Sequence, residues 1–484
     1  MKKITWKLIA CFMAVLLLCM PVLTGCDKPG DEPETTLGEV VEETTEETTE
    51  ETTELENMLP GSVGLEFVSY GDGTCYVSGI GECTDTDVVI PSVSPDGDRV
   101  VKIGFSAFDC NQELTSVIIP RGVTEIGAVA FLNCNRLTSV TLPDGLLSIN
   151  SHAFSDCYAL TSINIPDSVT TIENDVFTNC NKLSVQDEGG VYYIDHWVVG
   201  CDQKVTTVDL RSDTVGIYSR SFQECSELTS ITIPDSVVSV GAFSFFGCKK
   251  LIQVENGIHY VDRWVINCDK TIKTAVLRPN TVGISDLAID SCANLESINI
   301  PDSMKYIGAG GVIRCSKLTS VEIPVGVKKI GTYSFSNCPA LESIIVQKGN
   351  PMYHSEGNCL IETESKILLA GCKNSVIPTD DSVNRIGASA FLGCEDLTSI
   401  DLPANIRCIY DDTFCMCTSL KSITIPAGMT FIGGNAFYFC ENLTDITYSG
   451  NQAQWETVHI VDMNNEVLSS ATIHCTDGDI VPKQ

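Results

Sequence analysis

The stretch FSDCYALTSINIP spans residues 154–166. It recurs as FQECSELTSITIP at 222–234 and as FLGCEDLTSIDLP at 391–403. The phenylalanine of the motif returns at a step of 23 residues in Phe108, Phe131, Phe154 and Phe177. Self-similarity at a fixed period of this size indicates a protein built from stacked repeats.

The local pattern of one unit predicts a short strand followed by a turn. Leu160, Ile163 and Ile165 place apolar residues at the alternating end of the motif, as in a half-buried strand. Pro166 has no N–H to donate to a strand ladder, so it ends the strand, and Asp167, a residue that favours turns, follows it. One such unit cannot enclose a core, whereas stacked units bury a continuous one.

The motif is interrupted at three gaps, but the repeat keeps its phase across them. Counting 17 residues back from Phe222 gives Val205, in VTTVDL (205–210), and the same count from Ile289 gives Ile272, in IKTAVL (272–277). The third gap holds one coil and an excursion containing GNPMYHSEGN (349–358). With a first coil at VVIP (88–91), the chain is predicted to form about 16 coils of about 23 residues.

The motif C-x-x-L-T-S-I-x-I-P-x-S-V-x-x-I-G-x-x-A-F resembles the BspA-like, Treponema-type leucine-rich repeats of bacterial surface proteins. The resemblance covers roughly residues 65–475. It implies a β-rich leucine-rich-repeat solenoid, a curved rod with a parallel β-sheet on its concave face. We expect an N-terminal β-cap and first coil at 58–107, repeats at 108–445, and a C-terminal cap and tail at 446–484.

The N-terminus has the layout of an export signal. Lysines precede an apolar run at 8–23 that is short for a membrane span, and residues 1–25 are expected to be a signal peptide. Leu23-Thr24-Gly25-Cys26 resembles the lipobox of bacterial lipoproteins, which implies lipidation of Cys26. The alternative is an ordinary cleaved signal with a chance cysteine. Lipidation predicts a chain exported to the cell surface and anchored to the outside of the cytoplasmic membrane.

A Glu/Thr-rich segment follows and completes the region 26–57. It holds too few apolar residues to offset its ordering entropy, so the sequence predicts a disordered spacer. The formal net charge of the chain is −33. Because phosphate contacts need clustered Lys and Arg, this balance argues against binding nucleic acid.

Fifteen of the 24 cysteines occupy one register, between the Phe and the Leu of the motif. A metal site needs converging ligands, a nucleophile needs one privileged thiol beside a base, and equivalent positions favour no particular disulfide. We therefore predict an inert column of reduced, stacked thiols that act as small apolar residues. Outside this column, Cys75 and Cys83 could pair, and Cys415 and Cys417 form an isolated C-x-C. The sequence calls for no metal and no cofactor.

No catalytic motif is present, so the chain is not expected to be an enzyme. Binding is better supported, because the polar residues of each strand point outward and form columns. This candidate concave binding face consists of Ser139, Thr141, Ser162, Asn164, Ser230, Thr232, Ser297, Asn299, Ser320, Glu322, Ser399, Asp401, Ser422 and Thr424. A hydroxyl ladder that only keeps the surface soluble is the competing interpretation.

Aromatic residues in the degenerate coils offer a second candidate for binding. They lie in VYYIDHW (191–197), HYVDRW (259–264) and PMYH (351–354). The first two share the pattern Y-(I/V)-D-(H/R)-W, which favours packing within a recurrent coil variant over a ligand site.

The resemblance implies an adhesin-like surface lipoprotein that recognises host proteins, other cells or glycans. The expected partners are an extracellular protein or glycan and the membrane that holds the lipid, and the chain is expected to be a monomer. An envelope scaffold without a host ligand is the alternative.

Overall fold

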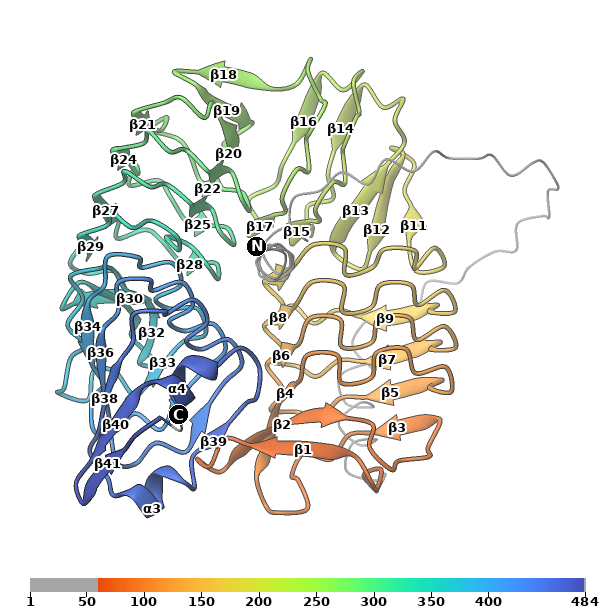
Figure 1. Ribbon diagram of the computed structural model, residues 1–484. Coiled ribbons are helices and arrows are strands. Elements are labelled where there is room, and N and C mark those ends of the chain that lie inside the picture. Colours follow the sequence, from red (N-terminus) through yellow and green to blue (C-terminus); the bar gives the residue numbers. More distant parts are fainter. Residues whose placement is uncertain (1–59, 483–484) are drawn as a thin grey trace, which may run out of the picture. The chain divides into compact units, whose positions relative to one another are not determined.

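Each repeat motif forms a short strand that pairs in parallel with the next copy. In β7 (Ser139–Thr141), Ser139 pairs with Ser162 and Thr141 pairs with Asn164 of β9 (Ser162–Asn164). A second strand follows the turn of each coil, as in β8 (Ser148–Ile149), which pairs with β10 (Thr171–Ile172). The chain therefore winds as a β-solenoid with two parallel ladders, shown in Figure 1.

This computed structural model describes residues 60–482. The signal segment, Cys26 and the Glu/Thr-rich stretch expected at 1–57 lie outside these residues. The solenoid belongs to a compact unit that begins at Gly61. Its fold class and its count of about 16 coils agree with the expectation from the 23-residue period.

We call the strands that follow the L-T-S motif the outer strands. Besides β7 and β9, they are β3 (Asp87–Val89), β5 (Ser116–Ile118), β14 (Thr207–Asp209), β16 (Ser230–Thr232), β21 (Thr274–Val276), β24 (Ser297–Asn299), β27 (Ser320–Ile323), β29 (Ser343–Val346), β34 (Ser399–Asp401), β36 (Ser422–Ile425), β38 (Asp445–Tyr448) and β40 (Thr472–Cys475).

We call the strands of the second ladder the inner strands. Besides β8 and β10, they are β4 (Arg99–Ile103), β6 (Glu125–Ile126), β13 (Trp197–Cys201), β15 (Gly216–Ile217), β17 (Ser239–Val240), β20 (Trp264–Cys268), β22 (Gly283–Ile284), β25 (Tyr306–Ile307), β28 (Lys329–Ile330), β32 (Ile367–Ala370), β33 (Arg385–Ile386), β35 (Cys408–Ile409), β37 (Phe431–Ile432) and β39 (His459–Ile460).

The remaining elements form hairpins, caps and a short side ladder. They are β1 (Glu66–Ser69), β2 (Thr74–Gly79), β11 (Val185–Gln186), β12 (Val191–Ile194), β18 (Gln253–Glu255), β19 (Ile258–Val261), β23 (Ile289–Asp290), β26 (Val312–Ile313), β30 (Tyr353–Glu356), β31 (Cys359–Glu362), β41 (Gly478–Ile480), α3 (Gln452–Trp455) and α4 (Glu466–Ser470). The hidden coils expected at 205–210 and 272–277 are present as β14 and β21.

The core of each coil is a stack of equivalent side chains. The Phe131 and Phe154 rings lie 5.1 Å apart and almost parallel, and both side chains are fully buried. Beside them, the Cys157 thiol donates a hydrogen bond to the Phe131 carbonyl of the preceding coil at 3.2 Å. Burial raises the pKa of the equivalent thiol, Cys134, to about 12. Cys134 and Cys157 are therefore free and buried, and burial keeps the Cys134 thiol protonated at neutral pH, as predicted for the cysteine column.

A parallel sheet lines the concave side as expected, but it is formed by the inner strands, so the placement of the L-T-S strands and their candidate binding residues on that side is wrong. In Figure 1 the outer strands lie on the outside of the curve and the inner strands line its inside. The Lys329 ammonium of β28 donates to the Thr170 carbonyl beside β10, so inner strands of distant coils face each other. The inner strands end in glycines such as Gly127, where an added Cβ would lie 2.7 Å from the Gly104 backbone. Coils can approach closely there, which makes the inner side the shorter one.

Candidate functional site

The outward positions of the outer strands form the surface that the sequence singled out. Ser162 and Asn164 are exposed, while Ile163 between them is partly buried. The same alternation holds for Ser297 and Asn299 of β24. All fourteen candidate residues lie at such positions, on β7, β9, β16, β24, β27, β34 and β36. They therefore share one face of the coils, on the convex rather than the concave side.

Three hairpins interrupt this face. β11 and β12, β18 and β19, and β30 and β31 each replace the outer-strand-to-inner-strand turn of one coil. The outer strands consequently fall into separate sheets, with β7 and β9 in one and β34 and β36 in another. The candidate residues do not form one continuous column, because each hairpin ends the parallel ladder and a further break separates β24 from β27.

The aromatic residues of the first two hairpins pack inside the coil. Tyr260 and Trp264 are buried, and Arg278 lies over the Tyr260 ring at 4.1 Å. An added Cβ at Gly283 would lie 2.2 Å from the Trp264 ring, so this coil requires glycine opposite the indole. The hairpin of Tyr193 and its neighbours repeats the arrangement with Arg211. The packing interpretation of the Y-(I/V)-D-(H/R)-W pattern is confirmed. The edge of the β18–β19 hairpin nevertheless borders a groove on the outer face.

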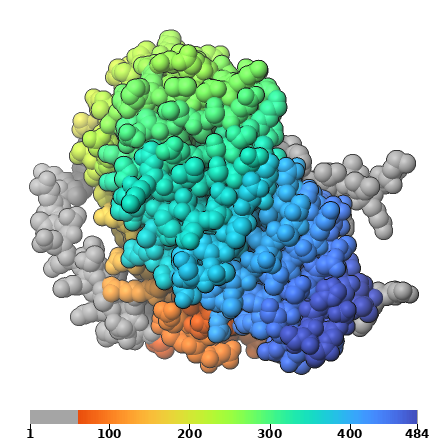
Figure 2. All heavy atoms as spheres, turned by 90° about the vertical axis from the view of Figure 1, so that its left-hand side faces the viewer, coloured from red at the N-terminus to blue at the C-terminus, as the bar shows by residue number. Residues whose placement is uncertain are grey.

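A groove lies on the outer face next to the β18–β19 hairpin. Its volume is about 640 Å³, and its lining includes Asn299 and Glu322 of the candidate set. Figure 2 views the molecule from the side that carries the outer strands β21, β24 and β27, which border this groove. Of the fourteen candidates, only these two line the groove.

One wall of the groove is held rigidly by Arg278. Its Nε donates to the Glu255 Oε2 at 2.7 Å and its Nη1 donates to the Gln253 Oε1 at 3.1 Å. The Arg278 guanidinium also stacks on the Tyr260 ring, and this contact holds the Arg278 side chain in place. Burial raises the pKa of Tyr260, which keeps the ring neutral. The wall is therefore preorganised before any ligand arrives.

The opposite wall is an amide held in place by a carboxylate. Gln347 Nε2 donates to Glu322 Oε1 at 3.0 Å, and Gln347 Oε1 accepts from the Val325 N–H at 3.2 Å. Between the walls, Val276 is 55 % exposed and gives the floor an apolar part. Carboxylates, amides and an exposed aliphatic side chain suit a ligand that is polar, neutral or basic, and partly apolar.

Sequence reasoning missed Glu255, Val276, Arg278 and Gln347. They lie in coils whose outer strands lack the S-x-(T/N) pattern, so the repeated polar positions did not include them. The motif HYVDRW (259–264) could have indicated the groove wall formed by Glu255 and Arg278, because it lies in the β18–β19 hairpin region.

The described residues contain no group of three or more His, Cys, Asp or Glu placed to hold a metal ion. Cys75, Cys83 and Cys417 form no disulfide. Among residues 60–482, no helix is long and apolar enough to cross a membrane.

Comparison with known proteins identifies the repeat. The BspA type leucine-rich repeat region matches residues 101–199, 199–310, 262–356 and 365–469. The chain belongs to the BspA-type leucine-rich repeat family. No curated protein matches this member of the family in sequence.

Solved structures similar to this BspA-type chain come from several bacteria. A leucine-rich cell surface protein of Faecalibacterium prausnitzii is 25 % identical, with 83 % of this chain and 98 % of that chain covered and a TM-score of 0.27. A leucine-rich repeat protein of Bacteroides ovatus is 25 % identical over 84 % of this chain and 98 % of that one, with a TM-score of 0.27. The leucine-rich repeat protein of T. pallidum is 22 % identical, with coverages of 53 % and 88 % and a TM-score of 0.24.

Proposed function

We propose that this chain is an adhesin-like binding protein that is lipid-anchored at the bacterial surface through Cys26. The family supports a repeat-based binding module at the cell surface. The ligand is an extracellular protein or glycan bound on the outer face, and the groove beside β18 is its principal site.

The preorganised groove is the observation that carries this proposal. Its volume of about 640 Å³ falls in the range of ligand sites, and fixed polar walls flank an exposed apolar floor. If the outer face served only to keep the protein soluble, ladders of hydroxyl groups would be sufficient and a groove with fixed walls would not be needed. Glu255 and Glu322 give the groove an acidic character that Arg278 only partly offsets, so a neutral or basic ligand segment is favoured.

Binding of the purified protein to arrays of extracellular-matrix proteins and glycans tests the proposal. Glu322→Lys breaks the contact with Gln347 and reverses one groove charge, so we expect loss of saturable binding of at least about tenfold. Glu395→Lys is the matched control, since Glu395 is exposed and does not line the groove. An array without any saturable signal would instead favour an envelope scaffold.

A further inference from the structure

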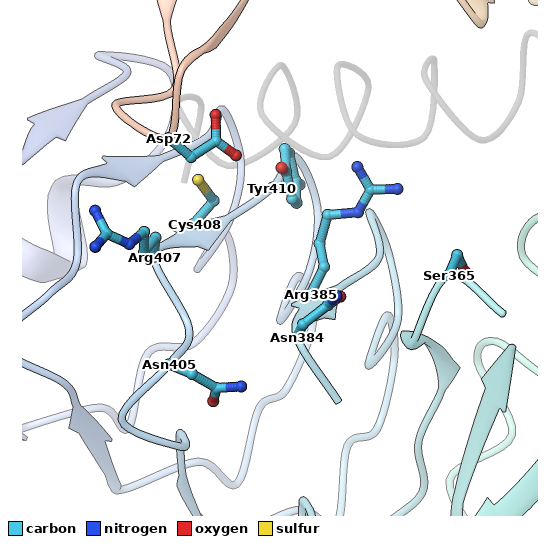
Figure 3. A pocket seen from close by; sticks show the side chains of 8 residues that line it. All are labelled: Asp72, Ser365, Asn384, Arg385, Asn405, Arg407, Cys408 and Tyr410. Carbon is cyan, nitrogen blue, oxygen red and sulfur yellow. The ribbon is translucent and has the colours of Figure 1, made fainter. Parts of the chain in front are cut away.

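A second cavity, of about 390 Å³, lies on the inner side of the solenoid, away from the groove. The turn between β1 and β2 forms one wall through Asp72, and the coils of β33 and β35 form the rest. Figure 3 shows Arg385 and Arg407 on neighbouring coils, on either side of Cys408 and Tyr410.

The wall formed by Asp72 is tied to the distant coils. The Tyr70 carbonyl accepts hydrogen bonds from the Thr430 hydroxyl at 2.7 Å and from the Cys408 thiol at 3.5 Å. The Asp72 carboxylate is already occupied, because its Oδ1 accepts from the backbone N–H and the hydroxyl of Thr74. The cavity is therefore preorganised, and Asp72 is directed to its own turn rather than to the arginines.

Arg385 and Arg407 are unusual cations for so acidic a chain. Both are exposed, and within residues 60–482 neither lies within 4.0 Å of a carboxylate oxygen. Arg278 and Arg314, by contrast, each hold a carboxylate at 2.7 Å. The Arg385 guanidinium lies 5.8 Å from the centre of the Tyr410 ring, and this contact with Tyr410 orients it.

Besides Asp72, Cys408, Tyr410 and the two arginines, the lining is polar and uncharged. Asn384 and Asn405 belong to the same two coils as the arginines, and Ser365 adds a hydroxyl. Asn405 Nδ2 donates to the Val383 carbonyl at 2.8 Å, which leaves its amide oxygen free to accept. No aliphatic side chain lines the cavity.

We propose that this cavity binds an acidic saccharide, with acidic groups on Arg385 and Arg407 and hydroxyls on the asparagine amides. Guanidinium donors suit carboxylate or sulfate oxygens, and amides and hydroxyls suit sugar hydroxyls. A peptide ligand would favour aliphatic side chains as anchors, and this lining contains none. A long polyanion such as nucleic acid would be repelled by a chain of net charge −33.

Calorimetric titration of the purified protein tests this site. An oligomer of galacturonic acid, a sulfated galactose oligomer and a neutral galactose oligomer serve as probes. We expect saturable binding of the carboxylated or the sulfated probe, with the stronger of the two naming the acidic group. The neutral probe should bind at least about tenfold more weakly, and added salt should weaken binding of the acidic probe.

Arg385→Gln and Arg407→Gln should each weaken binding of the acidic probe about tenfold, and the double variant should abolish it. Arg136→Gln is the matched control, because Arg136 is exposed and pairs with Glu113 on a different part of the solenoid. Thermal melts should be alike for all variants, since the substituted side chains are exposed.

Equal binding of the neutral probe, or full binding by the double variant, would overturn the proposal. So would the failure of both acidic probes, or equal affinity for a glutamate oligopeptide. The outer groove shares no residue with this cavity, so these outcomes leave the proposed function untouched.

Discussion

The Thr430 hydroxyl donates a hydrogen bond to the Tyr70 carbonyl at 2.7 Å, although 360 residues separate them in the chain. The Tyr70 ring packs edge-on against Phe431 at 5.0 Å and against Tyr410 at 5.3 Å. An added Cβ at Gly71, which has a φ of +74°, would lie 2.6 Å from the Thr430 Cβ. The first hairpin thus packs closely against the last coils, and the two ends of the repeat array are in contact.

Tyr70→Ala should separate the two ends of the array. The substitution removes a side chain that is only 6 % exposed, and loss of a buried aromatic costs about 3 kcal/mol. The coils themselves should stay intact, because the Phe and Cys columns do not involve this residue. Small-angle scattering should therefore report a larger radius of gyration with an unchanged circular dichroism spectrum.

The control for this change is Tyr158→Ala, which removes a half-exposed tyrosine from a turn. It should leave the radius of gyration as in the wild type. An unchanged radius in Tyr70→Ala would show that the contact with Thr430 and Phe431 does not hold the ends together.

Cys110, the first cysteine of the column, should react with thiol reagents much faster than the buried cysteines that follow it. Cys110 is exposed, whereas Cys134 is fully buried and its pKa is raised to about 12 by burial. Although a neighbouring Asp109 raises the pKa of Cys110, its sulfur is accessible to reagents. In a mass-spectrometric time course with iodoacetamide at pH 8, Cys110 should react at least about a hundredfold faster than Cys134. Comparable rates in the folded protein would contradict the inert column.

The 23-residue period was sufficient to predict most of the coils, because each coil repeats the same local sequence pattern. Leu160 and Phe154 fixed the phase, and counting from such positions located β14 and β21 despite their poor match to the motif. The inner strands were missed because pairs such as Ser148–Ile149 are too short to show alternation.

The curvature and the site walls depend on features that no single repeat encodes. Gly127 lets neighbouring coils approach on one side, and only the accumulated effect decides which ladder becomes concave. The contact of Tyr70 with Thr430 joins residues from opposite ends of the array, so no period reveals it. Arg278 lines the groove because a hairpin brings Glu255 to it.

The C-terminal hairpin should weaken as pH rises. In β40, His474 Nδ1 lies 2.9 Å from Asp479 Oδ1, and its Nε2 lies 3.4 Å from Asp445 Oδ1. These partners, Asp479 first, raise the pKa of His474 above that of a free histidine. The stabilisation is therefore fully present below the unfolded-state pKa and is lost as pH rises through the folded-state pKa.

Hydrogen exchange of β40 and β41 should accordingly be slower at about pH 6 than at about pH 8, after correction for intrinsic rates. His474→Gln should remove this difference. An NMR titration of His474 that gives an ordinary histidine pKa would rule out the effect.

Cys26→Ala should release the protein from the cell surface. If the Leu23–Cys26 segment is a lipobox, the substitution removes the only thiol that can accept the lipid there. Immunoblots of membrane and medium fractions should then find the protein in the medium, while Cys110→Ala stays with the membrane. Continued membrane association of Cys26→Ala would refute lipid anchoring.

We expect the ligand to bind in the groove between the β18–β19 hairpin and the outer strands β24 and β27. Hydrogen–deuterium exchange of the protein with and without a ligand identified on the arrays tests it most directly. We predict slower exchange at 253–261 and 297–323, and no such protection in Glu322→Lys. Protection confined to other coils, or protection that persists in Glu322→Lys, would show that the ligand binds outside this groove.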